Sequence, residues 1–283
     1  MINHMSYILF DIGGTNTRVT VSEDLKSFEK PIKFKTPINF KEGIDKIVEA
    51  AESLAKTNIR GACGAVRGML SEDRTYIAHD DVLSKWVEES LSDTLAKRLK
   101  TKVCLENDAA LAGLGEAHFG TGKGADIMVY HTISTGVGGA KIEKGKIDSY
   151  HLGFEPGKQV LDIDRTILGD DILPTLENLV SGAAVEERTG AKPYDIPQED
   201  AIWDQLANYL AHGLRNTIYY WSPDVIVLGG SMITGNPAIP LENITRHTEL
   251  VLADDIAVPE LRVAKLKDDS GLYGAMVLLG QMD

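Results

Sequence analysis

Residues 7–21 read YILFDIGGTNTRVTV, two β-rich runs joined by a pair of glycines. This pattern predicts a strand, a tight turn and a returning strand. Glycines allow positive φ and close approach of the backbone to a ligand, the small hydroxyl residues add donors, and Arg18 adds a cationic fork that suits phosphate. The turn at residues 13–16 can therefore cradle an anion. The alternative is an ordinary hairpin whose glycines serve only the turn.

The same design returns at residues 127–143, where an apolar run leads through STGVGG at 134–139 into a second run. Two strand, turn and strand units in one chain indicate a duplicated domain. A third glycine pair, at 229–230, follows the buried-strand pattern of residues 225–228. We interpret these three loops as elements that converge on one polyphosphate between two domains.

Helical periodicity recurs along the chain, at residues 40–57, 85–99, 109–117, 173–187, 202–221 and 271–281. Further strand patterns lie at 61–66 and 103–105. This alternation predicts an α/β protein in which helices flank mixed sheets.

Composition narrows the class of protein. A chain of 283 residues is most simply two domains, each able to bury its own core. The net charge of −13 disfavours a nucleic-acid or anionic-membrane partner, because nonspecific affinity for both comes largely from Lys and Arg. Cys63 and Cys104 lie in apolar runs and read as buried thiols. With no secretory signal and no long apolar span, we expect a cytoplasmic protein.

Taken together, the motifs at 11–18 and 134–139 resemble those of the ROK family of sugar kinases, within the actin-like ATPase superfamily. The resemblance continues in the family's order through the motifs ENDAA at 106–110, ENLVSG at 177–182, GGS at 229–231 and YGA at 273–275. It implies two actin-like, ribonuclease H-like α/β domains with the active site in the cleft between them. The expected domains are residues 1–118 and 119–270, with a C-terminal helix, at about 271–283, packing back on the first.

The implied function is that of an ATP-dependent kinase that transfers the γ-phosphoryl group to a hexose or amino-sugar hydroxyl, as glucokinases, fructokinases and N-acetylhexosamine kinases do. ATP and Mg²⁺ are the implied cofactors. By resemblance, Asp108 is the general base, Asn107 orients sugar hydroxyls, and Asp11 holds Mg²⁺ through water. Residues expected at ATP and its phosphates are Asp11, Gly13, Gly14, Thr15, Asn16, Arg18, Thr135, Gly136, Gly182, Gly229 and Gly230. For Asn107 and Asp108 the alternative is helix capping, and for Arg18 it is an ion pair on the second strand.

The sugar pocket is where this chain agrees with the family and departs from it. Gly68 matches the glycine that approaches the sugar, while Arg67 replaces a proline. Glu155 and Glu177 match sugar-binding carboxylates. Lys158 replaces a histidine that joins three cysteines in a zinc site, and residues 159–176 contain no cysteine, so we predict no zinc site. Lys158 is either a replacement sugar contact, an ion-pair partner of Glu155 or Glu177, or a solvated lysine.

These motifs are compatible with two other functions. One is a sugar-sensing binding protein that has lost transfer, and the other is a nucleotidase or ATPase that acts without sugar. The expected partner is a small-molecule sugar, with no nucleic acid and no membrane, and a homodimer is common among the proteins it resembles. The sugar itself and the hydroxyl phosphorylated are not specified by these motifs.

Overall fold

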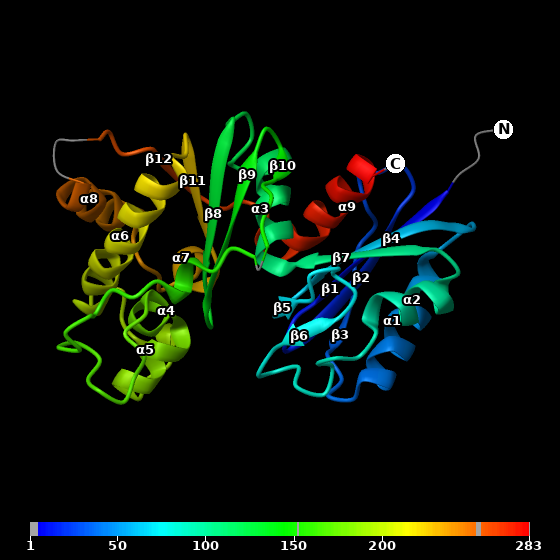
Figure 1. Cartoon of the computed structure of the whole chain (residues 1–283), viewed down its shortest axis with the longest axis horizontal. Helices are drawn as coiled ribbons and strands as arrows, with labels where there is room; N and C mark the ends of the chain where they lie inside the picture. The colour runs from blue at the N-terminus through cyan, green and yellow to red at the C-terminus, as the bar shows by residue number, and fades with distance from the viewer. Residues whose placement is uncertain (1–4, 152, 253–255, 283) are drawn as a thin grey trace. The chain divides into compact units, whose positions relative to one another are not determined.

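The computed structural model describes residues 5–151, 153–252 and 256–282. The chain divides into two compact units (Figure 1). The first holds the described residues of 5–115, 149–153 and 268–282, and the second those of 116–148 and 154–267. The division falls within helix α3 (Asp108–Phe119), near the domain boundary predicted after residue 118. The domain limits themselves stay a prediction.

A five-stranded mixed sheet forms the centre of the first unit, in the order β3-β2-β1-β4-β7. Its strands are β1 (Ser6–Ile12), β2 (Asn16–Ser22), β3 (Ile32–Lys35), β4 (Ile59–Val66) and β7 (Lys102–Asn107). Strands β1, β2 and β3 are antiparallel neighbours, and β4 and β7 continue the sheet parallel to β1. The predicted strand, turn and returning strand at 7–21 is therefore confirmed, with Asp11 directly opposite Arg18.

The second unit repeats this plan, in the order β10-β9-β8-β11-β12. Its strands are β8 (Ile127–Ile133), β9 (Val137–Glu143), β10 (Lys146–Ile147), β11 (Val225–Gly229) and β12 (Glu260–Val263). The first three are again antiparallel, and β11 and β12 again run parallel to β8. Two sheets with one order and one set of directions support the predicted duplication.

Helices cover both faces of the first sheet: α1 (Phe40–Leu54) and α2 (Leu91–Leu99) lie on one face and α9 (Ser270–Met282) on the other (Figure 1). Side chains of a strand alternate between faces, so Ile8, Phe10 and Ile12 enter the core beneath α1 and α2. Asp11 consequently points to the opposite face, where Gly271 of α9 approaches its carboxyl group. A short hairpin of β5 (Met69–Leu70) and β6 (Ile77–His79) completes the strands described in this unit.

The helix predicted from residue 85 is wrong over its first turns, because α2 begins only at Leu91. Trp86 is buried, and its indole Nε1 donates to the Pro37 carbonyl at 3.0 Å. The apolar residues of this segment therefore enter the core from an irregular loop, although their spacing suits a helix.

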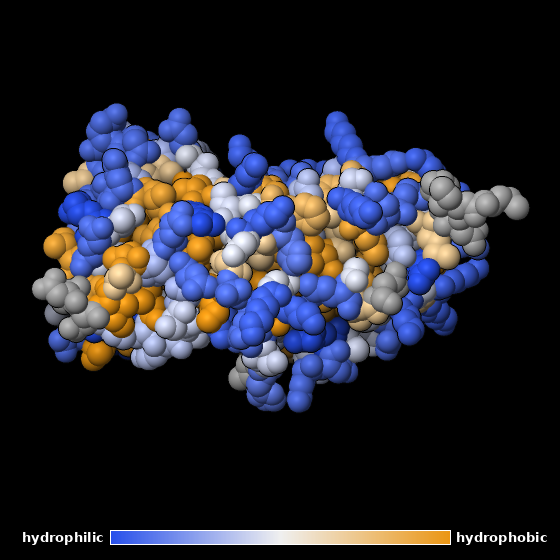
Figure 2. All heavy atoms as spheres, turned by 90° about the horizontal axis from the view of Figure 1, so that it is seen from above, coloured by the Kyte–Doolittle hydropathy of each residue, from blue (hydrophilic) through white to orange (hydrophobic). Residues whose placement is uncertain are grey.

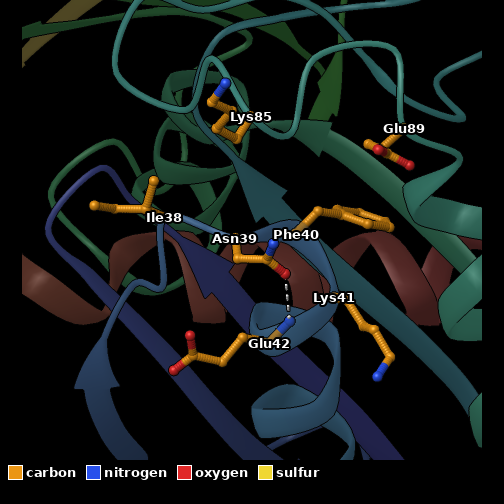
Figure 3. Close-up of a pocket in the computed structure, with 7 residues that line it drawn as sticks. All are labelled: Ile38, Asn39, Phe40, Lys41, Glu42, Lys85 and Glu89. Carbon is orange, nitrogen blue, oxygen red and sulfur yellow. Dashed lines mark hydrogen bonds between the residues drawn. The ribbon is translucent and has the colours of Figure 1, made fainter.

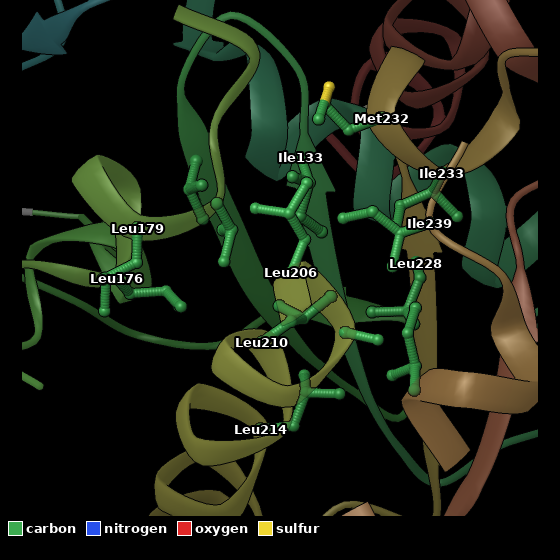
Figure 4. Close-up of a cluster of buried hydrophobic side chains, with 14 of the residues drawn as sticks. Ile133, Leu176, Leu179, Leu206, Leu210, Leu214, Leu228, Met232, Ile233 and Ile239 are labelled. Atoms are coloured by element: carbon green, nitrogen blue, oxygen red, sulfur yellow. The ribbon is translucent and has the colours of Figure 1, made fainter. Parts of the chain in front are cut away.

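The helices of the second unit are α4 (Leu176–Val180), α5 (Gly182–Thr189), α6 (Ile202–Trp221), α7 (Ser231–Thr234) and α8 (Leu241–Leu252). Single 3₁₀ turns add η1 (Pro156–Lys158) and η2 (Pro193–Asp195), and η3 (Lys267–Asp269) precedes α9. Figure 4 shows Leu206, Leu210 and Leu214, spaced one turn apart on α6, within the buried cluster. The single helix predicted at 173–187 is two helices, because Ser181 is extended and its hydroxyl accepts from the Ala184 N–H to start the second.

Polar and charged side chains cover much of the face shown in Figure 2, with apolar residues between them. Across the part of the chain that the structure describes, no helix has the length and apolar character to cross a membrane.

Candidate active site

The predicted site residues fall into one group in each unit. The first unit contains Asp11, Gly13, Gly14, Thr15, Asn16, Arg18, Gly68, Asn107 and Asp108. The second unit contains Thr135, Gly136, Glu155, Lys158, Glu177, Gly182, Gly229 and Gly230.

The β1–β2 turn is held in place by hydrogen bonds to its carbonyl groups. Gly13 N–H donates to the Asn16 carbonyl at 3.1 Å, and Thr36 donates from its hydroxyl to the Gly13 carbonyl at 2.7 Å and from its backbone to the Thr15 carbonyl at 3.0 Å. Among the described residues, the N–H groups of Gly14 and Thr15 have no hydrogen-bond partner. A tight turn with its carbonyls engaged and its amides free is a concavity suited to an anion.

Asp11 and Arg18 form an ion pair beside this turn, with Arg18 Nη1 3.1 Å from Asp11 Oδ2. The other Arg18 nitrogen donates to Asp268 Oδ2 at 2.6 Å. Burial raises the pKa of Asp11 to about 7, even though Arg18 lowers it. The ion-pair alternative for Arg18 is thus what the structure shows, and its contact with phosphate stays a prediction.

Asn107 and Asp108 lie where β7 ends and α3 begins. Asn107 Oδ1 accepts from the N–H groups of Ala109 and Ala110 at 3.0 and 3.2 Å, so Asn107 does cap the helix. Its Nδ2 donates to the Gly68 carbonyl at 3.2 Å, which places the two predicted sugar-binding residues together. Asp108 Oδ1 accepts from the Ala109 N–H at 2.8 Å, and loss of hydration raises the pKa of the Asp108 carboxyl.

Sequence reasoning missed a cluster around Glu106, the residue before Asn107. Glu106 is buried, and its Oε1 accepts from the Asn107 N–H at 2.8 Å and from the Tyr150 hydroxyl. Its Oε2 lies 3.2 Å from Arg74 Nε, and the Arg74 guanidinium lies 4.7 Å from the centre of the Tyr150 ring. These three residues come from distant segments, and no spacing in the sequence joins them.

In the second unit, Ser134 links its own turn at 134–139 to Gly182 and to the glycine pair at 229–230. Its carbonyl accepts from the Gly182 N–H at 2.7 Å, and its hydroxyl lies 3.0 Å from that of Ser231, directly after Gly230. Gly230 has a φ of 85°, and a Cβ there would overlap the Ile133 backbone, so only glycine fits. Thr135, Gly136, Gly182, Gly229 and Gly230 are consequently brought together in this unit.

Glu177 lies against the same turn. Its Oε2 accepts from the Val137 N–H at 2.8 Å, and its Oε1 accepts from Lys158 Nζ at 2.7 Å. Of the alternatives for Lys158, the ion pair with Glu177 is therefore present, although the lysine side chain is 61% exposed. Glu155 is exposed at the start of η1, and its carbonyl accepts from the Lys158 N–H at 3.0 Å.

Within the described ranges, no three or more His, Cys, Asp or Glu residues are grouped so that they could hold a metal ion. The Asp11 carboxylate is the kind of oxygen group that Mg²⁺ contacts through its water ligands, and its contact with Mg²⁺ stays a prediction.

A surface pocket lies elsewhere in the first unit, at the start of α1 (Figure 3). Its lining residues are Ile38, Asn39, Phe40, Lys41, Glu42, Lys85 and Glu89, none of which is a predicted site residue. Asn39 Oδ1 accepts from the Glu42 N–H at 3.2 Å, so this hollow surrounds a helix cap.

Two mixed sheets of one plan, each with a glycine turn between its first two strands, define an actin-like α/β fold, and the predicted fold class is confirmed. Within that class, the ROK family model matches residues 7–282, and the chain belongs to the ROK family.

Known proteins agree with this assignment. The chain is 26% identical to a glucokinase of Thermotoga maritima over an alignment of 306 positions, which covers 95% of each protein. It is 30% identical to a fructokinase of Pediococcus pentosaceus over 184 residues, covering 60% of this chain and 62% of the relative. The fold matches the crystal structure of a ROK family glucokinase from Streptomyces griseus in complex with glucose and AMPPNP, with a TM-score of 0.80, 23% identity, and coverage of 98% of this chain and 99% of that one.

Proposed function

We propose that this protein is an ATP-dependent sugar kinase that transfers the γ-phosphoryl group of ATP to a hydroxyl of a hexose or amino sugar. The observation that carries the proposal is Asp108, a carboxyl group of raised pKa at the carboxyl end of β7, in the same unit as the anion-suited turn at 13–16. Sequence relatives named glucokinase and fructokinase support a sugar as the phosphoryl acceptor.

Each group has a role in this reaction. Asp108 accepts the proton of the attacking hydroxyl, and its raised pKa makes it a stronger base than an ordinary aspartate. Asn107 and Gly68 position the sugar, together with Glu155 and Glu177. The amides of Gly14 and Thr15 donate to phosphate oxygens, as do those of the turn at Thr135 and Gly136, while the glycines at 182, 229 and 230 leave room for the nucleoside. Mg²⁺ held by Asp11 through water neutralises the phosphate charge when it is bound.

A coupled ADP-release assay tests the proposal, with glucose, fructose, mannose, allose and the N-acetyl amino sugars as acceptors. We expect sugar-dependent ADP release with at least one sugar and little ADP release without sugar. Release that is independent of sugar would instead indicate an ATPase. Sugar binding by calorimetry with no ADP release would indicate a sugar-sensing protein. The cytoplasmic location, the homodimer and the absence of a nucleic-acid partner stay predictions.

A further inference from the structure

Arg67 lies directly after β4, beside the turn that we propose binds phosphate. Its backbone N–H donates to the Ile12 carbonyl at 3.1 Å, which fixes it next to the end of β1. A Cβ built on Gly14 would lie 2.9 Å from Arg67 Nη1. The guanidinium therefore borders Gly14, one of the two turn residues whose N–H groups have no partner among the described residues.

Asp80 binds this guanidinium through its Nε side. Arg67 Nε donates to Asp80 Oδ2 at 2.7 Å, and the Asp80 side chain is only 4% exposed. The other Asp80 oxygen accepts from the N–H groups of Val82 and Leu83 at 2.8 and 2.5 Å. Because two backbone N–H groups hold Asp80 through Oδ1, its Oδ2 orients the Arg67 side chain in the absence of a ligand.

The outer nitrogens of Arg67 remain available. Among the residues that the structure describes, Nη1 and Nη2 have no hydrogen-bond partner, and the side chain is one-third exposed (33%). A guanidinium held by one nitrogen and open at the other two presents a planar fork that matches phosphate oxygens.

Arg67 is also electrostatically coupled to the proposed base. It lowers the pKa of Asp108, against the larger opposing effect of burial. Val66 and Asn107 are paired in the neighbouring parallel strands β4 and β7, so the next residues, Arg67 and Asp108, follow at the same edge of the sheet.

We propose that Arg67 is a further catalytic residue, whose Nη groups donate to oxygens of the transferring phosphoryl group while Asp80 positions it. The proposal rests on the proposed kinase function. In the reaction, the sugar oxygen forms a bond to the γ-phosphorus and the bond to the β,γ-bridging oxygen breaks. The hydroxyl proton goes to Asp108, ADP leaves, and Arg67 stabilises the charge spread over the phosphoryl oxygens without itself gaining or losing a proton.

The test measures kcat and both Michaelis constants of Arg67→Ala with the best sugar of the panel. We expect kcat to fall by about 10²- to 10³-fold, the effect of removing one donor from a developing anion, with the KM values for sugar and ATP within a few-fold of the parent. Millimolar guanidinium added to the variant should restore part of kcat. Arg98→Ala is the matched control, since Arg98 makes an equivalent 2.7 Å pair with Asp45 on the exposed surface of the same unit. It should keep parental kcat and gain nothing from guanidinium.

Three results would overturn the proposal: a kcat of Arg67→Ala within a few-fold of the parent, a loss confined to the sugar KM, or a loss without guanidinium rescue that accompanies a lowered Tm. If Arg67→Ala does not fold, Arg67→Lys decides. That variant keeps the charge and loses the fork, so a kcat at least about tenfold lower at parental Tm supports the proposal, and parental kcat overturns it. A parent that transfers no phosphoryl group to any sugar would overturn the proposed function and this inference with it. An active parent with an unaffected variant would overturn this inference alone.

Discussion

At the scale of single residues, the proposed phosphoryl transfer depends on Asp108 as the base. We expect Asp108→Asn to lower kcat by about 10²- to 10⁴-fold, or roughly 3–5 kcal/mol, because an amide of similar shape cannot accept the hydroxyl proton. Sugar binding, measured by calorimetry, should survive. Asp93→Asn, on the exposed first turn of α2, is the control and should match the parent. Turnover of Asp108→Asn within a few-fold of the parent would remove Asp108 from the role of base.

The raised pKa of the same carboxyl group leads us to expect that enzyme activity depends on pH. Burial raises the pKa of Asp108, and the base must be ionised to accept a proton. Activity should therefore fall on acidification while an ordinary aspartate would still be ionised. The measurement is kcat/KM against pH at saturating Mg²⁺, and an acid limb at the usual aspartate range would contradict the assignment.

Lys158 predicts an effect on sugar recognition. We expect Lys158→Ala to raise the sugar KM more than it lowers kcat, because a lysine that holds the Glu177 carboxylate contributes equally to ground and transition states. Lys192→Ala, at an exposed lysine of the same unit, is the control. Unchanged sugar affinity in calorimetry would show that this is a solvated pair of little consequence, as many exposed ion pairs are. An increase in the ATP KM alone would assign the pair to the phosphate turn.

At the scale of elements, Glu116 of α3 fixes two loops of the second unit. Its side chain is fully buried, and its carboxylate accepts from the N–H groups of Lys265 and Leu266 at 2.8 and 2.7 Å and from that of Thr121 at 2.9 Å. We expect Glu116→Gln to lower the free energy of unfolding by about 2–4 kcal/mol, since the amide nitrogen must face a backbone donor.

That loss should lower Tm by about 5–15 °C in a thermal melt. Glu49→Gln, on the exposed face of α1, is the control and should leave Tm unchanged. A parental Tm for Glu116→Gln would show that these loops hold their positions without the carboxylate.

The elements predicted correctly from the sequence are those whose conformation is determined by their own local residues. The turn after β1 is an example, since adjacent glycines and alternating β-branched residues specify it without help from the rest of the chain. The segment at 85–90 is irregular although its spacing suits a helix, because Trp86 is buried in the core and its indole N–H bonds to the distant Pro37 carbonyl. Contacts between residues that are far apart in the sequence leave no signal in the spacing of apolar residues.

At the scale of the whole molecule, the predicted site residues also divide into those that a local motif identifies and those that only tertiary contacts identify. The glycine turns and the Asn107-Asp108 pair carry motifs and could be named from sequence. Arg67 could be noted only as a departure from the family pattern, because its significance depends on Asp80 and Gly14, which reach it through separate loops. An acidic chain of net charge −13 that handles a polyanion needs such local cations and free amides to attract it.

The residues around Lys158 also predict the zinc content of the whole protein. By the resemblance described above, Lys158 stands where the family has a zinc-ligating histidine, and its ammonium donates to Glu177 at 2.7 Å. A cation at that point opposes binding of a dication, and zinc sites need thiolate, imidazole or carboxylate ligands in a closed set. We therefore expect elemental analysis of the purified protein to find far less than one zinc per chain.

Chelation without nucleotide should accordingly leave Tm unchanged, because a structural zinc contributes about 10 kcal/mol or more where it supports a small fold. A melt with added Zn²⁺ serves as the control for weak surface binding. One tightly held zinc per chain, together with a Tm that falls on chelation, would contradict the prediction. It would direct attention to His151, whose Nδ1 lies 3.9 Å from the Glu72 carboxylate in the first unit.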